Sequence, residues 1–251
     1  EAFAECPVVV EAVFDLPRQA HAFLETEAGW ARLDDAGRLV ITASTQTPFR
    51  DVKEVAAALG LAPEAIRVAA PYLGGAFGGK DGITVQCLLG LAAMSVPGET
   101  VKMWWDREES FAAGVKRLPA RLRYRLGARK DGTFHALSVR AFFDTGAYAS
   151  LGGEIMTLGL EHAGSCYRIA NTSIEGRCAY TNNSVGGPFR GFGVPQTTAA
   201  MEQVVDMVAL KVGLDPLGIR LRNALRQGAR TCIGVPLRSS TGIVQCLAGL
   251  R

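Results

Sequence analysis

Short stretches of alternating apolar and polar residues, rich in β-branched side chains, predict most of the strands of this chain. Such runs, each bounded by turn residues, occupy residues 8–14, 38–43, 66–70, 100–105 and 171–180. Two more runs, 121–129 and 133–144, flank Lys130, Asp131 and Gly132, and an Asp-Gly turn between alternating segments indicates a β-hairpin.

Helical spacing of apolar residues appears in other segments. Residues 48–60 place four apolar side chains on one face and end at Gly60, while 84–94 predict a buried helix. Residues 196–212 predict a long helix, and Asp215 with Pro216 predicts the start of another. Hairpins and irregular loops separate most strands, so the expected fold class is α+β with mixed sheets and packed helices. We find no internal repeat, and no low-complexity linker divides residues 1–251.

Residues 74–81, with the sequence GGAFGGKD, are the most informative segment. Four of these eight residues are glycine, so the backbone can adopt positive φ angles and gather N–H groups on one side. A predicted strand precedes the segment and a predicted helix follows it, which is a layout that often binds ligands. This segment, called the glycine loop below, is therefore the first candidate for a binding site.

A phosphate loop is one alternative, because Gly74 to Lys80 fits the pattern Gly-x4-Gly-Lys. Asp81 stands where a phosphate loop has a Ser or Thr that binds magnesium, and its carboxylate would repel phosphate oxygens. Phe77 is also bulky for a loop that must wrap around phosphates. Both residues disfavour nucleotide hydrolysis. A glycine turn with a purely structural role is the remaining alternative.

A second glycine-rich segment, residues 186–196, repeats these features with the sequence GGPFRGFGVPQ. Both segments carry an aromatic residue among glycines, so they could converge on one cofactor and one planar substrate. Arg190 offers a charge or a backbone N–H group, and Phe192 offers a ring that could stack. Gln46, after the strand at 38–43, adds a neutral amide donor.

Charge and cysteine content narrow the class of protein only slightly. The 27 basic and 24 acidic residues give a net charge of +3, and the densest basic group is Arg121, Arg123 and Arg125. This group alternates as in a strand, which we interpret as a solvated face, with a nucleic-acid patch as the alternative. No apolar run approaches the roughly 18 residues of a membrane span.

The six cysteines are widely separated and form no Cys-x-x-Cys pair, which disfavours zinc or iron–sulfur ligation by this chain. Free thiols and the lack of a signal-peptide pattern favour a reducing, cytoplasmic location. The sequence begins with Glu1 rather than methionine, so we expect a processed product or a fragment.

Three motifs in this order resemble one family. Ser44-Thr45-Gln46, the glycine loop and residues 189–196 look like the molybdenum-cofactor domain of the xanthine oxidase and aldehyde oxidoreductase family of molybdenum hydroxylases. Residues 21–26 and 166–171 also resemble stretches of that domain. The resemblance covers nearly the whole chain and points to the first cofactor-binding domain of the molybdenum subunit.

The resemblance implies a cofactor and a reaction. The cofactor is molybdopterin with molybdenum, alone or as the cytosine dinucleotide, with a 2Fe-2S cluster and FAD on partner chains or domains. The reaction is hydroxylation of an N-heteroaromatic or aldehyde carbon with oxygen drawn from water. By resemblance, Gln46 hydrogen-bonds an oxo ligand, and Gln46, Phe77 and Arg190 lie near the metal without ligating it. The implied cofactor-binding residues are Gln46, Gly75, Ala76, Phe77, Gly78, Arg190 and Gly191.

The same resemblance implies substrate contacts for Asp81, Leu158 and Phe192. Phe192 stands where the family stacks a substrate ring, Asp81 where purine-oxidising members carry a glutamate, and Leu158 where they carry an arginine. Xanthine is disfavoured, because charge on a urate-like transition state would need another cation. Read without the family, Phe192 could instead fill the core, Gln46 could be a turn residue, and Asp81 could cap a helix that begins near Gly82.

One part of the family pattern is missing from this sequence. Family enzymes use a glutamate near the C-terminus of the molybdenum subunit as general base, within a second cofactor-binding region, whereas this sequence stops at Arg251. We therefore expect no catalytic residue here and no activity without the missing half. Expected partners are the rest of the molybdenum subunit, an iron–sulfur subunit, an FAD subunit and a small-molecule substrate, but no nucleic acid. A non-catalytic scaffold of the same fold is the alternative.

Overall fold

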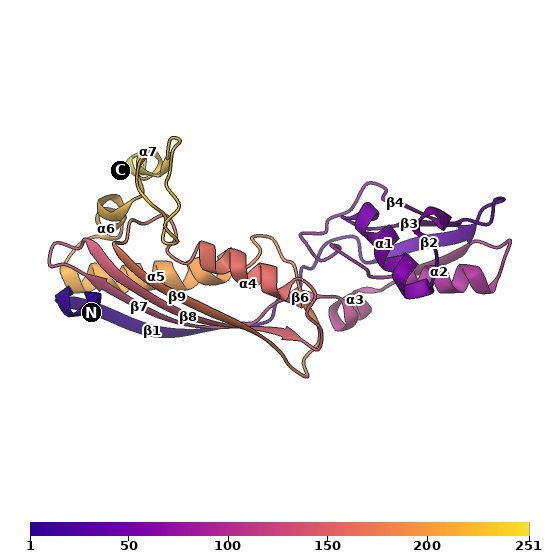
Figure 1. Ribbon diagram of the computed structural model, residues 1–251, viewed down its shortest axis with the longest axis horizontal. Helices are drawn as coiled ribbons and strands as arrows, with labels where there is room; N and C mark the ends of the chain where they lie inside the picture. Colours follow the sequence, from indigo (N-terminus) through magenta and orange to yellow (C-terminus); the bar gives the residue numbers. More distant parts are fainter. Residues whose placement is uncertain (251) are drawn as a thin grey trace. The chain divides into compact units, whose positions relative to one another are not determined.

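The computed structural model describes residues 1–250 and divides into two compact units (Figure 1). The first, called the long-sheet unit, comprises Glu1–Arg18, Leu118–Gly186 and the chain from Gly191 onward. The second, called the loop unit, comprises Gln19–Arg117 and Gly187–Arg190. Most of the loop unit is therefore an insertion between the first two segments of the long-sheet unit.

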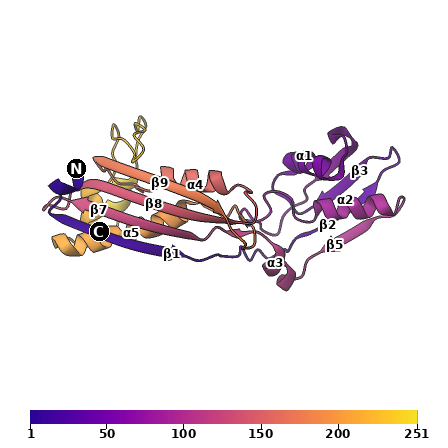
Figure 2. The same ribbon diagram turned by 60° about the horizontal axis from the view of Figure 1, so that its bottom comes forward.

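The long-sheet unit is built on a four-stranded sheet in the order β1-β7-β8-β9. β1 and β7 are antiparallel, as are β7 and β8, whereas β8 and β9 are parallel and are joined through helix α4. Helices α4 and α5 run along one face of this sheet (Figures 1 and 2). The bounds are β1 Val8–Leu16, β7 Ala120–Ala128, β8 Phe134–Gly146, α4 Gly152–Glu161, β9 Asn171–Tyr180 and α5 Val194–Val212.

Strict alternation along β7 separates the core of this unit from its open face. Leu122, Tyr124 and Leu126 are fully buried and belong to one cluster with Val204 and Val208 of α5. Arg121, Arg123 and Arg125, which alternate with them, point to the other face and are exposed. The interpretation of this basic group as one face of a strand is therefore confirmed.

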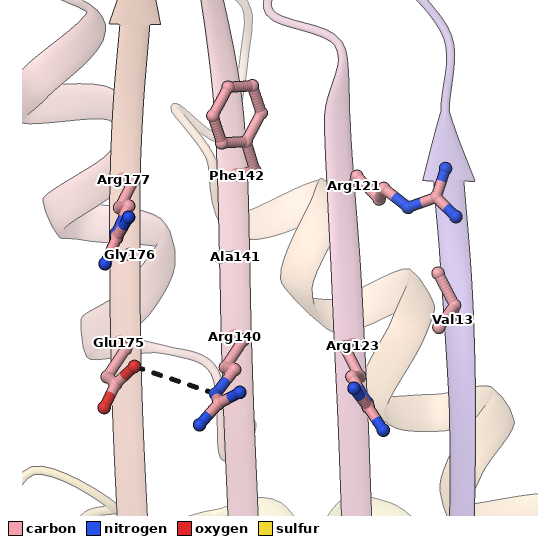
Figure 3. Close-up of a pocket in the computed structure, with 9 residues that line it drawn as sticks. All are labelled: Val13, Arg121, Arg123, Arg140, Ala141, Phe142, Glu175, Gly176 and Arg177. Carbon is pink, nitrogen blue, oxygen red and sulfur yellow. Dashed lines mark ion pairs between the residues drawn. The ribbon is translucent and has the colours of Figure 1, made fainter.

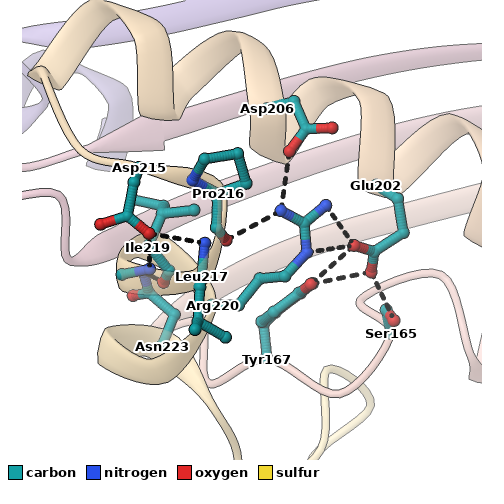
Figure 4. A network of polar contacts seen from close by, with 11 residues as sticks. Ser165, Tyr167, Glu202, Asp206, Asp215, Pro216, Leu217, Ile219, Arg220 and Asn223 are labelled. Atoms are coloured by element: carbon teal, nitrogen blue, oxygen red, sulfur yellow. Dashed lines mark hydrogen bonds and ion pairs between the residues drawn. The ribbon is translucent and has the colours of Figure 1, made fainter. Parts of the chain in front are cut away.

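Helix α6 (Pro216–Asn223) is fastened to α5 by a charged network (Figure 4). The Arg220 guanidinium lies 2.8 Å from a carboxylate oxygen of Glu202 and 2.7 Å from one of Asp206, both on α5. The Tyr167 hydroxyl donates to Glu202 at 2.7 Å. As predicted, Asp215 caps α6 by accepting from two backbone N–H groups.

A short helix η1 (Ala2–Glu5) lies at the N-terminus, and α7 (Ile243–Ala248) lies near the end of the described chain.

The loop unit contains a second mixed sheet, in the order β4-β3-β2-β5. β3 and β4 are parallel and are connected through α1, whereas β2 pairs antiparallel with β3 and with β5. The bounds are β2 Ala28–Leu33, β3 Leu39–Ala43, α1 Pro48–Leu59, η2 Pro63–Ala65, β4 Ile66–Ala69, α2 Gln86–Ser95, β5 Val101–Trp104 and α3 Arg107–Ala113. The short strands β6 (Lys116–Arg117) and β10 (Gly186–Gly187) form a separate two-stranded sheet.

A glycine in α2 allows the two main helices of the loop unit to approach closely. A Cβ atom on Gly90 would lie 2.7 Å from Leu59 of α1, closer than real contacts allow. Helix α1 ends as predicted at Gly60, which has a φ of 68° in the left-handed region. Ile41 of β3 and Leu89 of α2 lie in the buried core between sheet and helices.

The fold class predicted from the sequence, α+β with mixed sheets, is confirmed, and each predicted strand and helix has a counterpart in the structure. The strands and α-helices not predicted from the sequence are β2, α3, α4, the short strands β6 and β10, and α7. β2 carries Gly29 and only weak alternation, and α4 begins in a glycine-rich stretch that favours a loop. Among the helices of residues 1–250, none is long and apolar enough to cross a membrane.

Candidate functional site

The glycine loop connects β4 to α2 within the loop unit and adopts a strained backbone path. Gly75 and Gly78 have φ values of 102° and 99°, and Phe77 has a φ of 52°, which is uncommon for a residue with a side chain. Helix α2 starts only at Gln86, with Val85 as its first flanking residue. The interpretation of Asp81 as a helix cap near Gly82 is therefore wrong, because the helix begins several residues later.

Three successive backbone N–H groups of this loop are available to a ligand. Within residues 1–250, the N–H groups of Gly75, Ala76 and Phe77 have no hydrogen-bond partner. Ala76 is only 7% exposed, and buried backbone donors are normally paired. Successive unpaired donors on a glycine loop suit an acceptor-rich ligand.

Gln46 lies between β3 and α1 and is bound to the same loop. Its backbone N–H donates to the Lys80 carbonyl at 2.9 Å, and its side-chain oxygen accepts from the Gly78 N–H at 2.9 Å. This second bond leaves the amide –NH₂ of Gln46 as the end that can donate to a ligand. The structure therefore brings Gln46 together with the glycine loop, as the sequence predicts.

Residues 187–190 of the second glycine segment also contact the glycine loop. The Arg190 N–H donates to the Phe77 carbonyl at 2.8 Å. A Cβ atom on Gly78 would lie 2.9 Å from the Pro188 carbonyl, so only glycine allows this approach. The predicted convergence of the two segments is thus present for Phe77, Gly78 and Arg190.

His21 and Arg117 support this contact through their side chains, and no sequence motif indicates the role of Arg117. The His21 ring stacks on Phe189 with centroids 4.2 Å apart, and its Nε2 donates to the Pro188 carbonyl at 2.6 Å. The Arg117 guanidinium also lies over the Phe189 ring, 4.1 Å from its centroid, and donates to the Arg190 carbonyl at 3.0 Å. Burial lowers the pKa of His21, and the positive charges of Lys116 and Arg117 lower it further. His21 therefore stays neutral at pH 7.

The lysine of the glycine loop is occupied inside the unit. Lys80 is fully buried, with its ammonium 2.7 Å from the Glu25 carbonyl and 3.1 Å from the Glu25 carboxylate. The carboxylate also accepts from the Gly74 N–H at 2.7 Å and from the Ser44 hydroxyl. Burial lowers the pKa of Lys80, against the effect of Glu25. Because this ammonium cannot reach a bound phosphate, the structure disfavours the phosphate-loop interpretation.

Asp81 has a charged partner that the sequence reading did not identify. One carboxylate oxygen of Asp81 lies 2.6 Å from Nη2 of Arg50, on the first turns of α1. Arg50 also lies 3.3 Å from Glu54, one helical turn further on. Both side chains of the Arg50–Asp81 pair are partly exposed, at 35% and 23%. Among residues 1–250, no group donates to the second carboxylate oxygen of Asp81, so it can accept a hydrogen bond from a ligand.

Leu158 and Phe192 lie together in the long-sheet unit. Both line a hollow of about 590 Å³, beside Met156. Phe192 has a φ of 50° and is partly buried against the main core, so it serves both as core contact and as wall of the hollow. A Cβ atom on the neighbouring Gly193 would lie 2.1 Å from the Ile155 carbonyl, which explains the glycine there. The residues lining the hollow are Gly153, Glu154, Met156, Thr157, Leu158, Glu161 and Phe192.

A larger hollow, of about 620 Å³, contains none of the predicted site residues. It lies on the open face of the long sheet, and four of its nine lining residues are arginines (Figure 3). Within residues 1–250, no three His, Cys, Asp or Glu side chains are close enough together to hold a metal ion. Protein side chains of this region thus offer no metal site of their own.

The molybdopterin cofactor-binding domain family matches residues 1–224, and the chain belongs to this family. The nicotinate dehydrogenase large molybdopterin subunit of Eubacterium barkeri is 38% identical over 250 residues, covering 100% of this chain and 59% of that protein. The xanthine dehydrogenase molybdenum-binding subunit of Escherichia coli O157:H7 is 31% identical over 238 residues, covering 95% of this chain and 32% of that protein. The resemblance to the molybdenum hydroxylases seen in the sequence is therefore confirmed.

Solved structures agree with this assignment. The aldehyde oxidoreductase from Desulfovibrio gigas superposes with a TM-score of 0.95 at 31% identity, covering 100% of this chain and 27% of that one. Quinoline 2-oxidoreductase from Pseudomonas putida 86 gives a TM-score of 0.91 at 26% identity, covering 99% of this chain and 32% of that one. The chain spans 59% or less of the length of the relatives named here.

Proposed function

We propose that this chain forms one wall of the molybdopterin site of a molybdenum hydroxylase that oxidises an N-heteroaromatic compound, with an aldehyde as the second candidate. The observation that carries the proposal is the row of free N–H groups at Gly75, Ala76 and Phe77 beside the Gln46 amide. These donors fit a group that is rich in acceptor oxygens. The chain also belongs to a family of molybdopterin cofactor-binding domains. When bound, this cofactor supplies a redox-active metal for hydroxylation with oxygen from water.

The chain's own residues would hold and orient the cofactor. Gln46 donates from a side-chain –NH₂ whose direction is set by its bond to Gly78, so little ordering is needed on binding. Gly75, Ala76, Phe77 and Gly78 contribute backbone, and Arg190 with Gly191 continues the wall from the second segment. Arg190 is held at Phe77 by its own N–H, so Gln46, Phe77 and Arg190 are the residues proposed to lie nearest the metal.

Substrate binding is assigned to residues of both glycine segments and of α4. Phe192 and Leu158 present apolar surface in one hollow, which suits an aromatic ring. Asp81 offers one acceptor oxygen to a polar N–H group of the substrate. Relatives named for nicotinate, quinoline and xanthine support an aromatic nitrogen heterocycle as substrate class. Xanthine itself is disfavoured only because Leu158 offers no cation to a negatively charged transition state. The relative named aldehyde oxidoreductase is the reason for keeping an aldehyde as second candidate.

The proposal includes partners and a location. The general base and the rest of the pterin contacts would come from the remaining part of the molybdenum subunit, and a 2Fe-2S subunit and an FAD subunit would accept the electrons. The relatives named as subunits support such an assembly. A cytoplasmic location is supported by six unpaired cysteines, of which Cys6 and Cys232 are buried with raised thiol pKa values caused by burial.

Metal analysis of the assembled enzyme tests the proposal. The chain is co-purified with its partner subunits, and molybdenum and pterin are measured per complex for the natural sequence and for Gln46→Leu. We expect stoichiometric cofactor and turnover of an N-heteroaromatic compound, with turnover reduced about 100-fold in Q46L because an oriented donor is lost. Gln203→Leu, at an exposed glutamine of α5, is the matched control.

Two results would argue against the proposal. A complete complex without molybdenum and pterin would exclude a cofactor role. A complex in which both Gln46→Leu and Phe192→Ala keep full turnover would instead favour a non-catalytic scaffold of the same fold.

A further inference from the structure

The open face of the long sheet carries an ordered grid of charges. The strand register sets Asp15, Arg121, Phe142 and Arg177 in one row across the four strands. The next row contains Val13, Arg123, Arg140 and Glu175, and the third begins with Glu11 and Arg125. Helices α4 and α5 cover only the other face (Figures 1 and 2). The grid is therefore exposed in the described chain.

Two arginines face each other at the centre of this grid, although neighbouring carboxylates offset part of the charge: Arg123 forms an ion pair with Glu11, and Arg121 lies 3.3 Å from Asp15. Arg123 is directly opposite Arg140 on the neighbouring strand, and like charges at such positions destabilise a sheet. Glu175 lies 3.7 Å from Arg140, but their side chains are 68% and 70% exposed, so this ion pair contributes little to stability. Residue pairs that disfavour folding, such as these facing arginines, are typical of functional surfaces.

The grid also has the shape and composition of a contact surface. Figure 3 shows Arg121, Arg123, Arg140 and Arg177 around Phe142, and together they line the hollow of about 620 Å³. A second hollow of about 190 Å³ shares Arg123 and Arg140 and extends the surface toward Glu11. Phe142 is 43% exposed, and arginine beside an exposed aromatic ring is a composition enriched at protein interfaces.

We propose that this grid docks an acidic protein surface from the part of the enzyme that the chain does not include. The grid carries five arginines and only three carboxylates, so its net charge is positive. A partner with carboxylates around an apolar side chain would complement it in charge and in shape. The relatives contain protein beyond the region that matches this chain, and such a region could carry the acidic surface. The origin of the partner in the same enzyme rests on the proposed function, whereas the charge and shape of the grid do not.

A protein partner fits the grid better than a nucleic acid does. Glu11, Asp15 and Glu175 lie among the arginines and would repel a phosphate backbone. Val13 and Phe142, 49% and 43% exposed, have no use in phosphate binding but bury apolar area against a protein. Guanidinium groups bind carboxylates in bidentate geometry, which gives the contact direction.

Arginine footprinting on the assembled enzyme tests the proposal. Phenylglyoxal modification is mapped by mass spectrometry in the purified complex and again after dissociation in high salt. We expect Arg121, Arg123 and Arg140 to be protected only in the complex, whereas Arg226, exposed on the same unit outside the sheet, is modified in both states. Equal modification of the grid arginines in both states would overturn the proposal, as would protection by added single-stranded DNA but not by the partner subunits.

A substitution separates docking from a structural role. Arg140→Thr removes the repulsion with Arg123 and keeps a strand-forming residue, so the unfolding temperature should stay the same or rise. Affinity for the partner subunits should nevertheless fall about tenfold or more, as for a central interface arginine, while Arg226→Thr changes neither quantity. Unchanged affinity of R140T would overturn the proposal. Molybdenum content of the same preparations reports separately on the proposed function.

Discussion

A partly exposed glutamate and a buried lysine hold the glycine loop in its conformation. The Glu25 carboxylate binds the start of the loop at the Gly74 N–H and its end at the Lys80 ammonium. Burial acts to raise the pKa of Glu25, but hydrogen bonds from Ser44, Gly74 and Lys80 together lower it. A lysine that the sequence presents as a ligand-binding group thus serves as an internal clamp.

Removing one member of this clamp should cost more stability than removing both. Glu25→Gln leaves the buried Lys80 charge without its counterion, and we expect a loss of about 3 kcal/mol, at the low end for buried pairs because Glu25 is 34% exposed. The double variant Glu25→Gln with Lys80→Met removes both charges and should be more stable than Glu25→Gln alone. Urea denaturation of the variants, analysed as a double-mutant cycle, measures this difference. Additive losses would show that the two groups do not act as a pair.

The Arg50–Asp81 pair should affect substrate use more than folding. Both side chains are partly exposed, so Arg50→Met should change the free energy of unfolding by less than about 1 kcal/mol. The Asp81 carboxylate would then lose its fixed direction, and kcat/KM for the N-heteroaromatic substrate should fall about tenfold, mostly through KM. Arg50→Lys, which keeps a cation, should recover part of the loss. A destabilised variant with normal kcat/KM would instead assign Arg50 a structural role.

At the scale of elements, the two glycine segments are held together by side chains that lie far away in sequence. His21 reaches Pro188 and Phe189 from the first segment of the loop unit, and Arg117 reaches Phe189 and Arg190. Burial keeps His21 neutral by lowering its pKa. This arrangement predicts that acid weakens the contact between the segments.

The sign of this pH effect follows from proton linkage. In the unfolded chain His21 binds a proton near its ordinary pKa of 6.5, whereas in the folded chain it does so only at lower pH. Its contribution to stability is therefore complete above about pH 6.5 and is lost as pH falls, with a slope of at most about 1.4 kcal/mol per pH unit. Thermal unfolding between about pH 6.5 and 5 should show this slope, and His21→Gln should reduce it. An equal slope in both proteins would contradict the assignment to His21.

For the whole molecule, local sequence patterns predict the helices and strands better than they predict the division of the chain into two compact units. Alternation in β7 and the caps of α1 and α6 could be predicted from the sequence because each depends on neighbouring residues. The contacts of Glu25 with Lys80 and of Arg50 with Asp81 join distant positions, so no local pattern indicates them. The family motifs placed Gln46, Phe77 and Arg190 together, but their roles, like those of Leu158 and Phe192, stay predictions. Two compact units could not be predicted either, because no linker composition marks residues 18 or 118.

The topology suggests how the two units can be tested for independence. β1 and β7 pair antiparallel with Leu16 opposite Ala120, so the chain leaves the long-sheet unit and returns to it at neighbouring positions. Replacing residues 19–117 by an Asn-Gly turn would join β1 and β7 as an ordinary hairpin. Because the core of β7 and α5 lies wholly within the long-sheet unit, we expect the shortened chain to fold and to unfold cooperatively. It should also fold faster than the full chain, since pairs such as Val8 with Ala128 become local. Circular dichroism and stopped-flow refolding measure both properties, and a shortened chain without a cooperative transition would mean that the long-sheet unit depends on its insertion.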